Sequence, residues 1–182
     1  TSGMESYRAF LPAFHAKYEL GQSMVLRSSI SRQNALQPFL YMVPVLKVKH
    51  KKEIIEKGNP DLAPAKSWNY HLSIQQNIRN RSNIKAKVFY TNIRDVVEMR
   101  YLGIDTKFHY RTFQAMNVDT AMLYGSSIEF LADLLDFSSL NLRFWGSVSL
   151  NGSSLRDPGT HQKRRLNDQA TSLLSLNTDF LL

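Results

Sequence analysis

The chain has 182 residues, a formal net charge of +8 and 43% hydrophobic residues, and it contains no cysteine. This hydrophobic content favours one folded domain over a disordered chain, and the lack of cysteine excludes disulfides, thiolate metal sites and a cysteine nucleophile. No apolar run reaches the roughly 18–20 residues of a membrane-spanning helix, and we expect no signal peptide.

The first predicted element is an amphipathic helix in an N-terminal arm. Residues 1–3 precede Met4 and resemble the remnant of an expression tag, which leaves residues 4–37 as arm and linker. The predicted helix carries an aromatic face at helical spacing. This face docks either on the chain's own core or in a groove on a neighbouring copy, which makes these residues candidates for self-association: Phe10, Leu11, Phe14 and Tyr18. In the linker that follows, residues 24–30 are a candidate short strand.

Residues 39–48 are apolar on both faces of a predicted strand, which indicates burial or contact with another subunit. Pro44 cannot donate a ladder hydrogen bond, so this strand lies at an edge or contains a bulge. The strongest basic run of the chain follows: Lys47, Lys49, Lys51, Lys52 and Lys57. Such a run suits the phosphates of a nucleic acid or an anionic lipid surface. The alternative is the solvated face of a helix that ends at residues 58–61.

The clearest strand pattern covers residues 68–90. Apolar residues alternate with polar ones on both sides of a turn-forming segment, at Trp68, Tyr70, Leu72, Ile74, Ile84, Ala86, Val88 and Tyr90. We therefore predict a long β-hairpin with Arg79 and Arg81 at its tip and Lys85 and Lys87 on its polar side. A hairpin alone is barely stable in water, so another part of the chain must cover its apolar face.

The remaining elements alternate between predicted helix and strand. A helix is expected over residues 92–104 and a strand over residues 107–115. The most regular helix covers residues 126–137, where Ser126 and Glu129 have capping-box spacing. A strand over residues 140–150, a turn at Asn151 and Gly152, a loop to residue 160 and a last helix near residues 166–174 complete the series.

The sequence carries no catalytic or cofactor motif. The five histidines, His15, His50, His71, His109 and His161, have no metal-ligand spacing, and no phosphate-binding glycine loop or nucleophile elbow is present. We therefore predict no enzyme, no cofactor and no metal. Trp145, on the polar side of its strand, either stacks on a nucleic-acid base or is covered by another element.

Positive charge is concentrated in the first half of the chain. Residues 1–90 hold 14 Lys+Arg and 5 Asp+Glu, whereas residues 91–182 hold 9 and 10. A basic half beside a near-neutral half favours one face for a polyanion and another for packing or self-association. The alternative is that the lysines only solubilise the surface.

The chain resembles the matrix proteins of rhabdoviruses, particularly the small ones of plant-infecting members. The similarity covers about 60 residues: residues 87–90 run into 93–97, and residues 128–137 run into 142–146. The resemblance implies a self-assembling α+β protein that coats anionic inner membrane and condenses ribonucleoprotein. It also implies that Phe10 and Phe14 make the self-contact and that the basic surface consists of Lys47, Lys49, Lys51, Lys52 and Lys57. The chain lacks the lysine-rich tail and PPxY motif of animal-virus members.

The predicted fold is a single α+β domain in which a mostly antiparallel or mixed sheet is packed by two or three helices. Residues 38–160 form its core domain, and residues 161–182 form a C-terminal helix or tail. The predicted function is a viral matrix-like structural protein of the virion, the host cytoplasm and the inner membrane face. Its expected partners are further copies of itself, the viral nucleocapsid or RNA, and anionic membrane.

The alternative function is an RNA-binding protein, such as a ribosome-associated subunit or a viral suppressor. In either case we expect polyanion binding by the basic run and by the hairpin: Lys47, Lys49, Lys51, Lys52, Lys57, Arg79, Arg81, Lys85 and Lys87. A deep pocket lined by converging polar groups would instead favour an enzyme.

Overall fold

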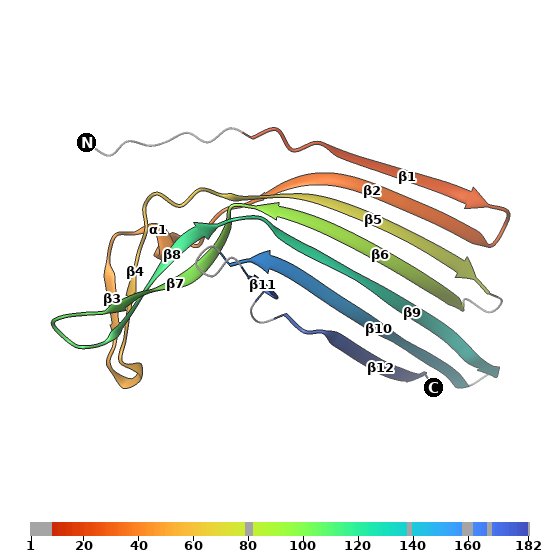
Figure 1. The fold of residues 1–182 in the computed structure, drawn as a ribbon. Coiled ribbons are helices and arrows are strands. Elements are labelled where there is room, and N and C mark those ends of the chain that lie inside the picture. The colour runs from red at the N-terminus through yellow and green to blue at the C-terminus, as the bar shows by residue number, and fades with distance from the viewer. Residues whose placement is uncertain (1–8, 79–81, 138–139, 158–161, 167–168, 182) are drawn as a thin grey trace.

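The chain folds almost entirely into β-strands in the computed structural model, which describes residues 9–78, 82–137, 140–157, 162–166 and 169–181 (Figure 1). Two helical turns, α1 (Phe39–Met42) and η1 (His50–Lys52), interrupt them. The strands are β1 (Ala13–Leu20), β2 (Met24–Ala35), β3 (Leu46–Lys49), β4 (Ile54–Lys57), β5 (Ala65–Asn77), β6 (Asn83–Arg94), β7 (Val96–Ile104), β8 (Arg111–Val118), β9 (Ala121–Phe137), β10 (Leu140–Arg156), β11 (Lys163–Arg164) and β12 (Ser172–Leu181).

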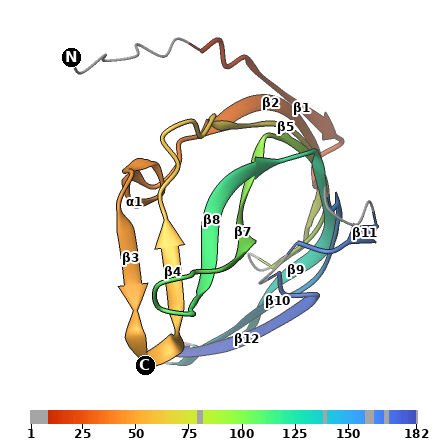
Figure 2. The same ribbon diagram turned by 60° about the vertical axis from the view of Figure 1, so that its left-hand side comes forward.

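The strands form two sheets. The long sheet has the order β1-β2-β5-β6-β9-β10, and β11 and β12 both pair with β10. Every neighbouring pair in it is antiparallel. The small sheet has the order β3-β4-β8-β7, and its β4–β8 pair is parallel. In Figure 2 the strands of the long sheet lie side by side along a curved surface, and Figure 1 shows the small sheet beyond one end of them.

The two ends of the long sheet differ in the length of their connections. At one end β1 and β2 are joined by residues 21–23, β5 and β6 by residues 78–82, and β9 and β10 by residues 138–139. At the other end the connections are residues 36–64, 95–120 and 157–171, and the first two of these contain the whole small sheet (Figure 1). One end therefore has short connections and the other has long ones.

The long sheet exposes its apolar side chains more than its polar ones. Along β6, Ile84, Val88 and Tyr90 are exposed, whereas Lys85 and Lys87 between them are half-buried. The strand register aligns these positions with alternate residues of the neighbouring strands, so that apolar residues share one face. We call this the apolar face, and the opposite, mostly polar side the polar face. The pattern inverts that of a water-soluble sheet.

A cluster of buried apolar side chains lies where the long sheet meets its long loops. Val118, Ala121 and Leu155 form a small cluster, and Ile93, Val96 and Leu166 pack against it. The core therefore lies under the loops and not along the apolar face.

Several predicted strands are confirmed. The hairpin of residues 68–90 is β5 and β6, the strand over residues 140–150 is part of β10, and the candidate strand at residues 24–30 is part of β2. The strand predicted over residues 107–115 overlaps β8. The strand predicted over residues 39–48 is correct only at β3, because residues 39–42 form α1.

The predicted helices are wrong, and so is the α+β class. Residues 13–20 form β1, residues 54–57 form β4, residues 96–104 form β7, residues 121–137 form β9 and residues 172–181 form β12. Their apolar residues satisfy a strand period as well as a helical one, and pairing with long neighbouring strands decides between the two. The turn predicted at Asn151 and Gly152 is also wrong, because both residues lie inside β10. No helix among the described residues is long and apolar enough to cross a membrane.

Candidate functional site

A row of aromatic residues crosses the apolar face close to its loop end. Tyr70 pairs with Tyr90, and Tyr90 pairs with Tyr124, so three tyrosines lie in register on β5, β6 and β9. The rings of Tyr70 and Tyr90 are 6.1 Å apart. Next to them on β10, Gly152 leaves room for the Tyr124 ring, since a Cβ there would lie 2.6 Å from it. The glycine therefore lets the tyrosine lie flat across the neighbouring strand.

The apolar face below this row is aliphatic and ends in a second aromatic group. Exposed aliphatic side chains fill it: Leu72, Ile74, Ile84, Val88, Ile128, Val148 and Leu174. The rings of Phe130 and Phe144 lie 5.5 Å apart at its lower end. Phe130 is six residues from Tyr124, or about 20 Å along a strand. An apolar band between two aromatic groups is the pattern of a surface that meets the hydrocarbon of a membrane and its two interfaces.

The polar face carries charged groups that pair across strands. Lys85 and Lys87 of β6 both contact Glu129 of β9, Lys85 at 3.8 Å. Arg143 of β10 donates to Asp133 of β9 at 2.8 Å, near a bulge in the β9–β10 ladder. Such paired, half-buried charges suit a face that borders water or polar groups and would be costly in lipid.

Side-chain amides tie the small sheet to the long one. The Asn117 amide nitrogen donates to the carbonyl of Ala63 at 2.9 Å and to that of Asp95 at 2.8 Å, and its oxygen accepts from the Ala63 amide at 2.8 Å. The Asn59 side chain donates to the Ala115 carbonyl at 3.0 Å. These bonds fix the segment before β5 against β8 and the β6–β7 corner.

An arginine links β7 to the connection after β10. The Arg164 guanidinium donates to Asp157 at 3.1 Å and makes two hydrogen bonds to Glu98 of β7. These carboxylates raise the pKa of Arg164. The arginine thus stays charged and holds this connection over the small buried cluster.

The outer end of the small sheet is aromatic and basic. The His50 ring lies edge-on to Phe108 and Tyr110, and the Lys107 ammonium lies 5.2 Å from the centre of the Phe108 ring. The Asp105 carboxylate accepts hydrogen bonds from the backbone amides of Lys107 and Phe108, both at 2.9 Å. The Phe108 amide is the main cause that lowers the pKa of Asp105, and the Lys107 amide adds to it.

The predicted polyanion-binding residues do not form one surface in the described structure. Lys47, Lys49, Lys51, Lys52 and Lys57 lie on or beside β3 and β4 of the small sheet, and Lys49 pairs with Glu56. Lys85 and Lys87 lie on the polar face of the long sheet, paired with Glu129. Arg79 and Arg81 lie outside the described residues. Polyanion binding by these residues stays a prediction.

The predicted self-association residues lie at the edge of the long sheet. Phe14 and Tyr18 project from β1 and are 66% and 64% exposed, and Phe10 and Leu11 are exposed just before it. Self-association through them stays a prediction. Trp145 lies on the polar face as predicted, between Leu131 of β9 and Asn177 of β12 in register. Among the described residues, no group of three His, Asp or Glu side chains gathers to hold a metal ion.

Sequence reasoning missed three cations above the tyrosine row, Arg32, Lys66 and Arg94, as site residues. Arg32, Lys66, Trp68 and Arg94 line a groove on β2, β5 and β6. The signal for them is the period of two, which continues from Ile30 to Arg32 and from Tyr90 through Asn92 to Arg94. The prediction of a helix that begins at Asn92 ends this alternation two residues too early.

The fold is similar to that of solved siderophore receptors. It matches PirA from Pseudomonas aeruginosa with a TM-score of 0.64 at 16% identity, covering 93% of this chain and 34% of that one. It matches PirA from Acinetobacter baumannii with a TM-score of 0.59 at 17% identity, covering 93% and 26%. The ferric enterobactin receptor PfeA from Pseudomonas aeruginosa matches at 0.59 and 13% identity, covering 80% and 25%. The chain thus spans a quarter to a third of these receptors' length.

The sequence matches a family model over nearly its whole length. The model describes the TonB dependent receptor-like β-barrel and covers residues 1–181. No curated protein matches the chain significantly.

These matches overturn the viral and RNA-binding predictions. The resemblance to rhabdovirus matrix proteins rested on a helix at residues 128–137, which is strand β9. The match to a receptor family of the bacterial outer membrane overturns the predicted locations in the virion and the host cell. It also overturns the predicted nucleocapsid and self-assembly partners and the RNA-binding alternative. Receptors of this kind are transporters, which agrees with the prediction that the chain is not an enzyme. The chain belongs to the TonB dependent receptor-like β-barrel family.

Proposed function

We propose that the chain forms part of the wall of an outer-membrane β-barrel, with its apolar face in lipid and its polar face lining the interior. The observation that carries this proposal is the inverted burial of the long sheet, in which exposed Val88 and Tyr90 alternate with half-buried Lys85 and Lys87. Lipid-facing apolar residues that alternate with interior polar ones are the pattern of transmembrane barrels. The edge strands β1 and β12, each paired with one neighbour among the described residues, would find partners in a closed barrel.

The two ends of the sheet give the barrel its orientation. Outer-membrane barrels have short periplasmic turns and longer extracellular loops. The tight turn at residues 21–23 therefore faces the periplasm, and the connections of residues 36–64 and 95–120 face the exterior. The small sheet then lies at the outer mouth of the barrel, where an incoming ligand arrives first.

For the ligand we propose an anionic iron chelate of the siderophore class. The structurally similar proteins are siderophore and ferric enterobactin receptors. The outer end of the small sheet joins the aromatic side chains of His50, Phe108 and Tyr110 to the nearby charges of Lys51 and Lys107. Aromatic rings and cations together attract an anionic aromatic ligand.

The placement in the membrane is tested with two neighbouring residues of β5. Leu72 lies on the apolar face and Ser73 on the polar face, and the chain has no cysteine of its own. Leu72→Cys and Ser73→Cys, each labelled with a polarity-sensitive fluorophore in the full-length protein in lipid vesicles, form a matched pair. We expect a blue-shifted emission that lipid-soluble quenchers reduce at residue 72 only. Equal emission and quenching at both positions would contradict a lipid-facing apolar face.

The ligand class is tested by uptake. Cells that make the protein should accumulate radioactive iron from a ferric siderophore faster than cells that lack it, and collapse of the proton gradient should remove the difference. Uptake that is independent of the protein for every siderophore tested would contradict the proposed ligand while leaving the barrel placement intact.

A further inference from the structure

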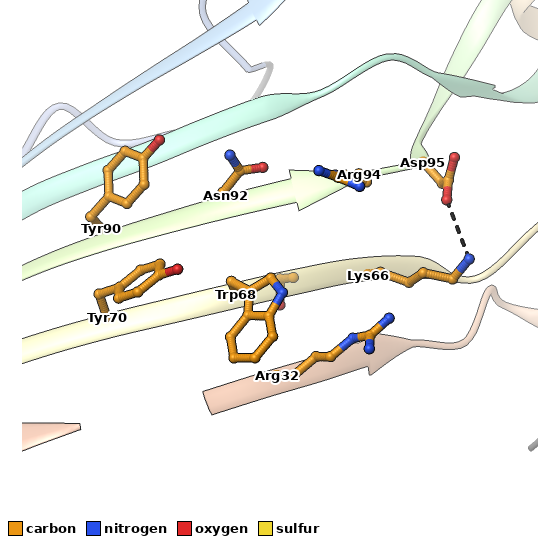
Figure 3. A pocket seen from close by; sticks show the side chains of 9 residues that line it. Arg32, Lys66, Trp68, Tyr70, Tyr90, Asn92, Arg94 and Asp95 are labelled. Carbon is orange, nitrogen blue, oxygen red and sulfur yellow. Dashed lines mark ion pairs between the residues drawn. The ribbon is translucent and has the colours of Figure 1, made fainter. Parts of the chain in front are cut away.

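Three cations lie together on the apolar face, just beyond the row of tyrosines. Arg32 comes from β2, Lys66 from β5 and Arg94 from β6, and with Trp68, Tyr70, Tyr90 and Asn92 they line an open groove of about 900 Å³. Figure 3 shows these side chains along adjoining strands, with Trp68 between the tyrosines and Lys66. We call this set of three cations the basic cluster.

The strand register fixes the level of the basic cluster relative to the membrane. Arg32 pairs with Trp68 and Trp68 with Asn92, one step of two residues beyond the tyrosine row. Lys66 pairs with Arg94 one further step toward the loops. Each step of two residues is about 7 Å along a strand. The cations therefore lie about 7–14 Å beyond the tyrosines, on the same lipid-facing side.

Tyrosine and tryptophan rings favour the level of the lipid headgroups. Cations immediately beyond such a belt meet the phosphates of those headgroups, and in the proposed orientation these belong to the outer leaflet. Phosphate attracts arginine strongly because the guanidinium presents two parallel donors.

The basic cluster carries more positive charge than the carboxylates that pair with it. Lys66 pairs with Asp95 at 3.6 Å, so one of the three cations is offset by a neighbouring carboxylate. Among the described residues, no acidic group pairs with the Arg32 or Arg94 side chain. Asp95 also lines the groove, but its carboxylate pairs with Lys66, so the Arg32 and Arg94 guanidinium groups are available to an anion from outside the described residues.

We propose that the basic cluster binds the phosphorylated sugar headgroup of an outer-leaflet glycolipid; this proposal rests on the proposed barrel function. The cations lie on three adjacent strands and so span about 10 Å across the sheet, because neighbouring strands are about 4.8 Å apart. A headgroup with two phosphates on a disaccharide fills that width and the groove between the cations. A glycerophospholipid carries a single phosphate and reaches fewer of them. Trp68 provides an apolar floor for a sugar ring or the first acyl carbons.

The test is native mass spectrometry of the full-length protein in a mild detergent, titrated with bisphosphorylated lipid A. Arg32→Gln and Arg94→Gln are the test variants. Arg27→Gln is the matched control, because Arg27 lies on the same strand as Arg32 but on the polar face, where it donates to Gln75 at 3.1 Å. Each test variant should bind lipid A about fivefold more weakly, the effect expected of one cation near a lipid surface. The control should bind as the unaltered protein does.

Further arms identify the chemistry that is recognised. Monophosphorylated lipid A and phosphatidylglycerol should bind more weakly than bisphosphorylated lipid A, and inorganic phosphate should not compete at millimolar concentration. Arg32→Lys, which keeps the charge, should retain most of the binding, and a circular dichroism spectrum of Arg32→Gln identical to that of the unaltered protein shows that its loss of binding is not loss of folding. Equal lipid A binding by Arg32→Gln, Arg94→Gln and the control would overturn the proposal, as would equal binding of phosphatidylglycerol.

Different experimental results would contradict the lipid A site and the barrel placement. If the probe at residue 72 reports lipid but the arginine variants bind lipid A normally, only the basic cluster is misassigned. If that probe reports water, the barrel placement itself fails, and the inference fails with it.

Discussion

At the loop end, hydrogen bonds from single polar side chains hold the segments in position, a role that a hydrophobic core has in most water-soluble domains. Asn117 makes three hydrogen bonds to the backbone of two other segments, at Ala63 and Asp95. Because few apolar side chains are fully buried in the described residues, such polar contacts set the position of the small sheet.

Replacing Asn117 should loosen the segment before β5. Asn117→Ala leaves two carbonyls and one amide without their partner, at a cost of about 1–3 kcal/mol for a buried polar group. We expect faster hydrogen exchange at the Ala63 amide, measured by mass spectrometry on the folded protein. Asn117→Asp keeps the acceptor for that amide but loses both donated bonds, so its effect should be smaller at Ala63. Unchanged exchange in Asn117→Ala would show that other contacts hold the segment.

The turn after β7 should depend on pH through Asp105. Its pKa is lowered chiefly by the Phe108 amide and also by that of Lys107, so the charged form stabilises the turn. Stabilisation from a lowered carboxyl pKa is present above the ordinary aspartate value of about 3.9 and is lost as pH falls through the lowered one.

We therefore expect amide protection at Lys107 and Phe108 to be constant at neutral and mildly acidic pH and to fall only below about pH 4. Hydrogen exchange, corrected for its intrinsic pH dependence, measures this. Asp105→Asn keeps an acceptor oxygen and should abolish the acid transition. A transition at neutral pH, or one that persists in Asp105→Asn, would assign the effect to another group.

At the scale of elements, β9 shows why strands were predicted as helices. Ile128, Leu131, Ala132 and the residues that follow have helical spacing, and Ser126 with Glu129 matches a capping box. The same segment also alternates, with Ser127 and Glu129 on the polar face and Ile128 on the apolar face. Local pattern alone leaves both options open, and the long partners β6 and β10 decide for a strand. The hairpin β5–β6 was predictable because its apolar and polar residues alternate strictly, and this period of two does not match a helix.

The two faces of β10 should respond oppositely to a new charge. Val148 is 45% exposed on the apolar face in register with Ile128, whereas the adjacent Ser147 lies on the polar face opposite Glu129. Val148→Arg should cost about 2–4 kcal/mol, the cost of arginine near the bilayer midplane. Ser147→Arg should cost less, because the polar face already holds charged groups around Glu129 and borders water or polar groups.

Urea-dependent folding into lipid vesicles, followed by tryptophan fluorescence, measures both variants of β10. Equal destabilisation by the two substitutions would mean that the faces of the sheet do not differ in environment.

At the scale of the whole molecule, the sequence predicted the charge but not its arrangement. The excess of cations in residues 1–90 is real, yet it divides between the small sheet, the polar face and the basic cluster. The error follows from assuming water around the sheet. On that assumption the apolar side of the hairpin needed helices to cover it, whereas a membrane face needs no cover. The tyrosine row depends on register between β5, β6 and β9, which local patterns do not give.

The orientation of the molecule in the membrane follows from the unequal connections at the two ends. Lys51, in the turn between β3 and β4, lies in the long-loop end, and Gln22 lies in the tight turn between β1 and β2. Both are exposed, so a short epitope inserted after either one adds to a surface turn and disturbs little packing. Antibody should bind the epitope at Lys51 on intact cells, and the epitope at Gln22 only after the outer membrane is permeabilised. The reverse result would place the small sheet in the periplasm and move the basic cluster to the inner leaflet, where it would meet glycerophospholipids.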